Sequence, residues 1–419
     1  MLRASILLVC GAASLFAQAT AKDIRQIARG GSSAIPQLQE YLRDPSFEVR
    51  VEVVKALTDI GTQHSLEPLI LATRDNDAEV QVRATDGLVN FYLPGYVRTG
   101  FGARVRRIGG QIQGRFTDTN DQVIPPHVEV RQEVVDAIGK LAGGGASMTS
   151  RANAARAIGI LRGRAALPDL VESLKSKNSD VIYEALIAFQ KIGDKSMGPE
   201  IAYLLRDFDQ RVQLAAIETT GLLQNHEAVP QLLEVFRRSG DKRVRKAALT
   251  SMAMMPREED RSLFLSHLQD RDEGLRQAAA EGIGRLRNPD DTAKLEAAFA
   301  SERSGSARLS QAFGLVAHGR TEVAEFSPLQ LLIATLSARS RQGEAYALLV
   351  EVGRDPKVRE QLHRSLGIGT KDEKIYLARI LALSGDETSV EPLERLSRDT
   401  DPDVASEALR AAQTLKSRL

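Results

Sequence analysis

The chain has 419 residues with 56 basic and 55 acidic side chains. Its net charge of +1 excludes the strongly basic balance that is typical of nucleic-acid-binding domains. The single cysteine is Cys10, tryptophan is absent and only 5% of the residues are aromatic. Thiolate metal sites and cysteine nucleophiles are therefore excluded beyond residue 10, and the core should consist of small and aliphatic side chains.

The first 21 residues have the pattern of a secretory signal peptide. Arg3 precedes an apolar run, Ala4 to Phe16, and small residues then suit cleavage after Ala19 or Ala21. The run is shorter than the ~20 residues that span a bilayer, which disfavours a membrane anchor. Val9 does not fit a lipoprotein cleavage box, so Cys10 should leave with the signal. We expect an exported chain, periplasmic or extracellular.

A repeat runs along the rest of the chain. Pro168, Pro199 and Pro230 are 31 residues apart. A second marker, a valine or leucine that follows a turn, recurs with steps of 31, 32 and 31 residues at Val181, Val212, Val244 and Leu275. Two markers with one period indicate a repeated structural unit.

Each unit reads as two helices. Proline is tolerated in the first turn of a helix, so the repeat prolines predict starts of first helices at Pro36, Pro68, Pro168, Pro199, Pro230 and Pro392. The second helix presents an apolar face at helical spacing, as in Val49, Val53, Leu57 and Ile60. Its end is predicted at a left-handed glycine in Gly61, Gly193 and Gly385.

The order of proline, leucines, aspartate, Val-Arg, alanines and glycine resembles the HEAT repeat, particularly the short form of the bilin-lyase-like group. The resemblance covers Ile24 to Leu415 and implies an all-α fold, an α-solenoid of about ten helix pairs in which second helices line a concave surface. The predicted parts are a signal peptide (1–21), N-terminal repeats (22–92), an irregular insert (93–127) and repeats over 128–419.

The insert interrupts the repeat. Val80 to Val130 is 50 residues instead of 31, and His127 to Leu141 is predicted to resume as a second helix. The segment before it is rich in glycine, which costs ~1 kcal/mol per residue in a helix interior, so no first helix is expected there. Its alternating side chains around Gly109-Gly110 permit a small β-hairpin.

Two groups of side chains are candidate binding sites. In the insert, arginines alternate with aromatic residues, the composition of interface hot spots, at Tyr96, Arg98, Phe101, Arg104, Arg106, Arg107, Arg115 and Phe116. They would contact an anionic or carboxylate-bearing partner, or else form a solvated loop on the solenoid. A second basic run spans a helix end, a turn and the next helix start at Arg237, Arg238, Lys242, Arg243, Arg245 and Lys246, where local helix stabilisation is the favoured interpretation.

In the resembling family, the Val-Arg arginine serves a ladder between repeats. Arg50, Arg245, Arg276 and Arg359 match that position, whereas Gln81, Ile182 and Gln213 depart from it, so the ladder should be broken. His64 and His226 each lie four residues before a repeat proline and should be structural.

No motif predicts catalysis. Gly100 and Gly102 lack the third glycine of a phosphate loop, no nucleophile motif appears, and one His-Glu pair is too few for a di-iron site. We expect no cofactor, no metal and no nucleic acid, and a monomeric, non-enzymatic scaffold or adaptor for a protein or peptide partner. Two alternatives stay open: a bilin-lyase-like enzyme or maturation factor, and a protein that binds an anionic membrane surface.

Overall fold

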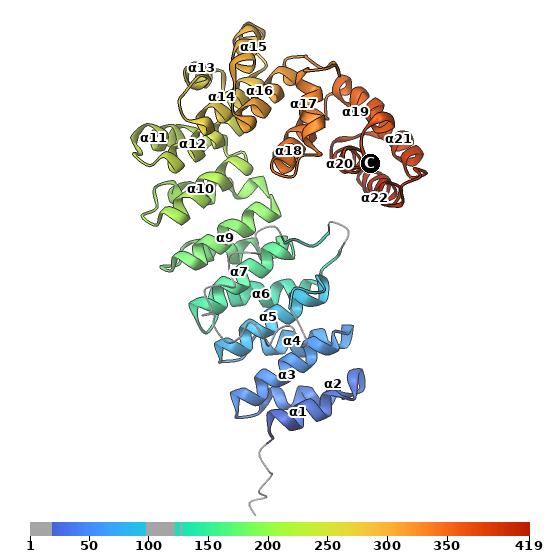
Figure 1. Ribbon diagram of the computed structural model, residues 1–419. Coiled ribbons are helices and arrows are strands. Elements are labelled where there is room, and N and C mark those ends of the chain that lie inside the picture. Colours follow the sequence, from blue (N-terminus) through green and yellow to red (C-terminus); the bar gives the residue numbers. More distant parts are fainter. Residues whose placement is uncertain (1–18, 98–121, 126–127) are drawn as a thin grey trace, which may run out of the picture. The chain divides into compact units, whose positions relative to one another are not determined.

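The computed structural model describes residues 19–97, 122–125 and 128–419 (Figure 1). The chain divides into two compact units, residues 1–193 and 194–419. Every regular element in the described residues is a helix, and first and second helices alternate along each unit. The predicted all-α solenoid is confirmed.

In unit 1, four helix pairs follow the short helix α1 (Ala21–Ala28), which packs on the second helix of the first pair. The first helices are α2 (Ile35–Glu40), α4 (Leu66–Ala72), α6 (Gln132–Gly144) and α8 (Leu167–Leu174). The second helices are α3 (Phe47–Ile60), α5 (Ala78–Tyr92), α7 (Met148–Ile160) and α9 (Ser179–Ile192).

Unit 2 contains seven helix pairs in its described residues. The first helices are η8 (Lys195–Arg206), α11 (Val229–Arg238), α13 (Arg261–His267), α15 (Thr292–Ser301), α17 (Pro328–Thr335), α19 (Pro356–Ile368) and α21 (Val390–Leu396). The second helices are α10 (Gln210–Leu222), α12 (Lys242–Met254), α14 (Glu273–Leu286), α16 (Gly305–Ala317), α18 (Gln342–Val352), α20 (Lys371–Ser384) and α22 (Pro402–Arg418).

Turn chemistry sets the boundaries of the second helices. An Asp or Asn side chain accepts backbone N–H groups of the first helical turn, as Asp77 and Asp272 do for α5 and α14. Such caps contribute ~1 kcal/mol each. Gly61 and Gly193 end α3 and α9 with φ of +59° and +70°, as predicted. Gly385 follows α20 in an extended conformation, with φ −70°, so the left-handed prediction is wrong there.

The repeat prolines lie in or near the first turn of first helices, with one difference. Pro168 and Pro230 are the second residues of α8 and α11. Pro199 lies inside η8, which is a 3₁₀ helix over its entire length. The repeat proline is therefore regularly spaced in the sequence, but at Pro199 the first helix is a 3₁₀ helix instead of an α-helix.

Residues 127–141 were predicted to contain the second helix of a pair, and this prediction is wrong. This segment forms α6, which begins at Gln132 and packs beside α4 and α8, so it is a first helix. The second helix of this pair is α7, where Ser150 takes the place of the repeat valine. From Val80 to Ser150 the step is 70 residues, so the chain gains a long connection and loses no helix.

Second helices touch through small residues. Gly159, Gly221 and Gly284 each lie nine residues after the marker position of their own helix. A Cβ at these positions would come within 2.7–2.8 Å of the Cα of Ala188, Ser251 and Gly314 on the next second helix. The backbones of adjacent repeats are therefore in direct contact, and any side chain would separate them.

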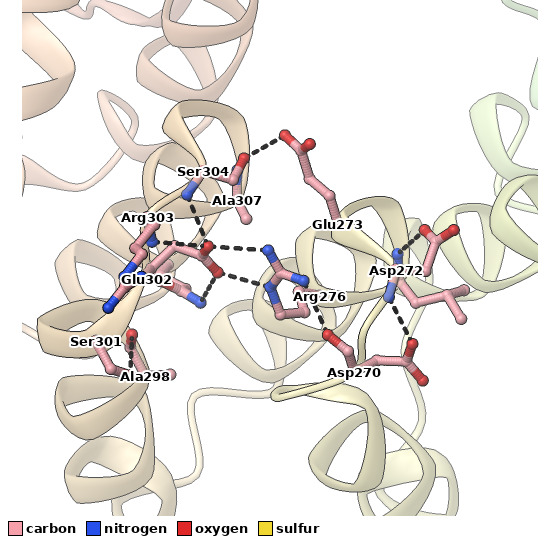
Figure 2. A network of polar contacts seen from close by, with 12 residues as sticks. Asp270, Asp272, Glu273, Arg276, Ala298, Ser301, Glu302, Arg303, Ser304 and Ala307 are labelled. Carbon is pink, nitrogen blue, oxygen red and sulfur yellow. Dashed lines mark hydrogen bonds and ion pairs between the residues drawn. The ribbon is translucent and has the colours of Figure 1, made fainter.

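Polar side chains link the turns of successive repeats, as Figure 2 shows for α14 and α15. Arg276 Nε and Nη2 donate to the two Glu302 carboxylate oxygens at 2.7 and 2.9 Å, and its Nη1 donates to the Asp270 carbonyl at 2.8 Å. Glu302 also accepts the backbone N–H groups of Arg303 and Ser304. One guanidinium thus joins its own turn to the next one.

The ladder continues through residues other than arginine. Arg50 donates to Asp75 at 2.7 Å, and Arg359 pairs with Asp386. Gln81 makes the same kind of link: its amide donates to the Asp75 carbonyl and accepts the Ala146 backbone N–H at 2.9 Å. The break predicted at Gln81 is therefore wrong, whereas the break predicted at Ile182 is confirmed, because isoleucine has no polar side-chain group. Gln213 donates to the Leu205 carbonyl of its own repeat at 3.0 Å.

The glycine contacts predict that a glycine-to-alanine substitution lowers the Tm at one position and raises it at another. Alanine favours a helix over glycine by ~1 kcal/mol, but overpacking costs about 1–3 kcal/mol. Gly284→Ala should lower the Tm, because the added Cβ would lie 2.7 Å from the Gly314 Cα and a backbone atom cannot move aside as a flexible side chain can. Gly367→Ala in α19 should raise it, since nothing lies within 4 Å of the added Cβ. Thermal unfolding followed by circular dichroism measures both, and a rise for Gly284→Ala would contradict the close contact.

The ladder predicts acid sensitivity. Hydrogen bonds from Arg276 lower the pKa of Glu302 from 4.5 to about 2. Because the folded pKa is depressed, this stabilisation is present above pH 4.5 and is lost as the pH falls toward 2. Glu302→Gln should lower the Tm at pH 7, and the difference from the unchanged protein should shrink between those values. Glu360→Gln, in the exposed pair with Arg364, is the control and should change the Tm little at either pH.

Candidate functional site

The insert leaves α5 through a fixed turn. Asn90 Oδ1 accepts the backbone N–H groups of Gly95 and Val97 at 3.2 and 2.9 Å. Gly95 has φ +92°, a conformation that favours glycine. Residues 95–97 therefore have a defined place beside the C-terminal end of α5.

Tyr96 reaches a buried ion pair on the next second helices. Arg156 of α7 donates to both Glu184 carboxylate oxygens of α9 at 3.1 and 3.2 Å, and the two side chains are 4% and 2% exposed. Tyr96 lies close enough to this pair to interact electrostatically with both Arg156 and Glu184. Burial and the nearby charge of Asp86 raise the pKa of Tyr96 above its ordinary value, while Arg156 acts in the opposite direction.

Asn153 extends this network to α5. Its amide nitrogen donates to the Asp86 carboxylate at 3.0 Å, and its oxygen accepts from Arg156 at 3.3 Å. Asp86, Asn153, Arg156 and Glu184 thus run across three consecutive second helices, and we call them the inner polar network. The repeat pattern did not reveal it, since polar residues at buried second-helix positions carry no spacing signal of their own.

The far end of the insert returns to the same helix pair. Ile124 is 2% exposed, and its backbone N–H donates to the Ile160 carbonyl at the end of α7 at 3.0 Å. Farther along, the Arg131 backbone N–H donates to the Tyr92 hydroxyl at 3.2 Å, and its guanidinium pairs with Glu67. Both ends of the insert are therefore attached to helices of unit 1.

Of the predicted insert site, Tyr96 is the member whose position is described. Arg98, Phe101, Arg104, Arg106, Arg107, Arg115 and Phe116 lie outside the described residues, as does the hairpin expected at Gly109-Gly110. The binding role of this group stays a prediction. What the structure adds is its attachment: Tyr96 on one side and Ile124 on the other.

The second basic run comes together around one turn of unit 2. Arg238 pairs with Glu234 one helical turn earlier at 2.7 Å, which fits the favoured local role. Arg243 donates to Gln210 of the preceding repeat at 2.6 Å. Arg245 holds the ladder position, but its guanidinium lies over the Phe236 ring, 5.0 Å from the centroid, instead of meeting an acidic partner in the described residues.

Second helices of unit 2 share an outward stripe with a spacing of four residues. It contains Leu214, Glu218 and Leu222 on α10, Lys246, Thr250 and Met254 on α12, and Gln277, Glu281 and Arg285 on α14. Leu222 is 49% exposed, and burial raises the pKa of Glu218. Arg285 extends past the neighbouring α16 and donates to both Glu351 oxygens of α18 at 2.8 Å. We call this stripe the second-helix face of unit 2.

A small cavity of about 280 Å³ lies where the insert ends, between the start of α6 and the turn after α7. Ile124, Val128, Val135 and Leu161 line it together with the polar Gln132, Arg162 and Arg164, and no carboxylate is among the lining residues that the structure describes. Its lining is therefore mixed, with apolar side chains of the returning chain on one part and two arginines on another.

His64 and His226 lie in short 3₁₀ turns before α4 and α11, at the equivalent turns that the repeat predicted. Among the residues that the structure describes, no three His, Cys, Asp or Glu side chains lie close enough to hold a metal ion. No helix over the same residues is both long and apolar enough to cross a bilayer.

The inner polar network gives a stability prediction. Removing one partner of a buried ion pair typically costs about 3–5 kcal/mol, because the other charge stays buried. Arg156→Met should therefore lower the Tm strongly, and adding Glu184→Met should recover part of the loss. Arg364→Met, in an exposed pair, is the control and should cost under about 1 kcal/mol. A double variant that is no more stable than Arg156→Met would contradict this account of the pair.

A model described as HEAT repeats matches residues 14–89, 198–265 and 229–315, and a model described as a PBS lyase HEAT-like repeat matches residues 150–176. No curated protein matches the chain.

Several solved structures resemble the fold at low sequence identity. An engineered protein is 16% identical, with 91% of this chain and 98% of that one covered and a TM-score of 0.34. The CpcE–CpcF complex of phycocyanin lyase from Nostoc sp. PCC7120 is 20% identical, with coverage of 64% and 92% and a TM-score of 0.37. Importin beta is 13% identical, with coverage of 94% and 59% and a TM-score of 0.45. The matched repeat models and the alternating helix pairs together identify the chain as a HEAT-repeat protein that contains a PBS lyase HEAT-like repeat.

Proposed function

We propose that the protein is an exported, non-enzymatic scaffold or adaptor that binds a protein or peptide. The partner would lie on the second helices, with the insert as an additional contact. The observation that carries this proposal is the attachment of the insert: Tyr96 meets the inner polar network on α7, and Ile124 bonds to the end of the same helix.

Attachment at both ends supports a binding role. Long connections in compact domains are usually functional or disordered, and loops commonly carry binding residues on a rigid scaffold. Here the connection begins and ends against buried groups of the second-helix layer. Its arginines and aromatic side chains would therefore stand beside the surface on which stacked repeats bind their partners.

The second-helix face of unit 2 supports the same role. Leu222 exposes an apolar side chain between charged neighbours such as Glu218, and Met254 contributes a flexible one. Mixed apolar and charged surfaces of this kind are typical of interfaces that form and dissociate. Stacked repeats provide such a surface over a long distance without requiring a catalytic centre.

Export is supported by the first residues of the chain and by the way α1 begins. Thr20 accepts the Asp23 backbone N–H, and Asp23 accepts the Thr20 backbone N–H at 2.8 Å. Cleavage after Ala19 would keep this capping pair, whereas cleavage after Ala21 would remove Thr20. We therefore favour Ala19 as the last residue of the signal.

The proposal is tested by capture from the cell envelope. The insert variant replaces residues 98–121 by a Gly-Ser linker, which keeps Tyr96 and Ile124 in place. Leu222→Ala tests the second-helix face, and Ile368→Ala, which alters an 84% exposed side chain on the first helix α19, is the matched control. The unchanged chain and the control should retain the same envelope protein, and the other two variants should retain less of it.

Equal capture by all four proteins would contradict binding through these surfaces. The purified partner is then incubated with the chain and weighed by mass spectrometry, where a change in its mass would show catalysis instead of scaffolding. The N-terminal sequence of the chain recovered from the envelope should begin at Thr20. A chain that stays in the cytoplasm with residues 1–19 attached would contradict export.

A further inference from the structure

One edge of unit 2 combines an exposed aromatic ring with unpaired cations. It is formed by two neighbouring turns: residues 206–211 between η8 and α10, and residues 237–246 between α11 and α12. Gln210 joins them, since its amide donates to Asp241 at 2.6 Å and accepts from Arg243 at 2.6 Å. We call this surface the basic edge.

Phe208 lies in the first of these turns. Its relative exposure is 106%, so the ring makes almost no contact with its own protein. A fully exposed phenylalanine gains nothing from folding, because its apolar area stays in water. The same turn could have been built with a polar residue at no cost to the helices on either side.

The acidic residues of the basic edge are directed into the turns. Asp207 accepts the backbone N–H of Asp209 at 2.8 Å, and Asp209 caps α10 by accepting from Arg211 at 2.9 Å. Asp241 caps α12 in the same way, accepting from Arg243 at 2.7 Å. Hydrogen bonds from Gln210 and from the backbone N–H groups of this cap lower the pKa of Asp241. Its carboxylate oxygens are therefore already bonded to groups of the turn.

The basic residues outnumber these acids. Glu234 is shared by Arg206 and Arg238, which leaves other cations exposed. Arg237, Lys242 and Lys246 are exposed and have no carboxylate partner within the described part of the chain. The Lys246 stem lies over Gly274, where a Cβ would come within 2.4 Å of it, so its charge is directed toward the next repeat.

The concentration of positive charge is local. The chain as a whole has a net charge of only +1. In the next repeat, the corresponding turn carries Asp270, Asp272 and Glu273 beside Arg271. The excess of basic side chains therefore does not continue into the next turn, and attraction to a negative group would be strongest at the two turns around Phe208.

We propose that the basic edge binds an acidic polypeptide segment that presents an apolar side chain to Phe208. Arginine beside an exposed aromatic ring is the composition enriched in binding hot spots, and the charges are complementary to Asp or Glu side chains. An anionic membrane fits less well, because insertion of Phe208 would carry Asp207 and Asp209 on both sides of it into the interface.

This site lies on the turn edge, shares only Lys246 with the second-helix face of unit 2, and uses neither the insert nor Leu222. It therefore goes beyond the scaffold function proposed above, and either can fail without the other. A chain that loses its envelope partner when the insert is replaced, yet still binds acidic peptide, would support two separate surfaces.

The test uses the full mature chain and a fluorescein-labelled peptide of glutamates interrupted by leucine and phenylalanine. Fluorescence anisotropy should show binding that weakens as salt is added. Arg237→Glu with Lys242→Glu should weaken it about tenfold or more, as expected for the loss of more than 1.4 kcal/mol of binding energy. Phe208→Ala should weaken binding of this peptide but leave an all-glutamate peptide unaffected.

Matched controls exist in the same unit. Arg354→Glu with Lys357→Glu makes the same charge change at another exposed turn, and Phe326→Ala removes a ring that is 81% exposed. Neither should alter binding, and circular dichroism verifies that every variant is folded. Equal weakening by the control pair would overturn the proposal, as would absence of peptide binding. Phe208-dependent binding to vesicles containing phosphatidylglycerol, with no binding of the peptide, would assign the edge to a membrane instead.

Discussion

Direct contact between the backbones of successive second helices is the constraint on which the rest of the structure depends. Gly159, Gly221 and Gly284 bring Cα atoms of neighbouring repeats close enough that even a methyl group would intrude. Such proximity fixes how far one repeat stands from the next. It also brings the turns of neighbouring repeats close enough for one side chain to link them, as Arg276 and Gln81 do.

Side chains in the turns bridge the short distance between neighbouring repeats. Arg276 and Gln81 belong to different chemical classes, yet each joins the carbonyl groups of its own turn to the next repeat. The arginine adds an ion pair with Glu302, whereas the glutamine completes the link with neutral hydrogen bonds. At these two positions reach and hydrogen-bond donors suffice, and Gln81 makes its link without a charge. At the equivalent position of α9, Ile182 has no side-chain donor, so the ladder does not run through every repeat.

Much of the fold could be predicted from the sequence, because two markers with one period locate the helix pairs. The role of α6 could not, since first and second helices both show apolar residues at helical spacing and only their packing partners distinguish them. Pro199 marks a first helix without determining its 3₁₀ winding. The inner polar network escaped prediction because Arg156, Asn153 and Glu184 lie on different helices, and their proximity follows from the stacking. The sequence could not predict the attachment of the insert through Tyr96, because that required the positions of α7 and α9.

The contact of Arg285 with Glu351 departs from the rule that a solenoid repeat interacts with its immediate neighbours. It joins α14 to α18 and also positions the guanidinium 5.1 Å from the centre of the Phe313 ring on the helix between them. Three consecutive pairs are thereby linked by a single side chain. In a linear array, unfolding can begin at an end and pass from one repeat to the next; a bond that skips a repeat ties the opening of the outer pair to that of the inner one. This part of unit 2 should therefore open as a cooperative block within an otherwise stepwise array.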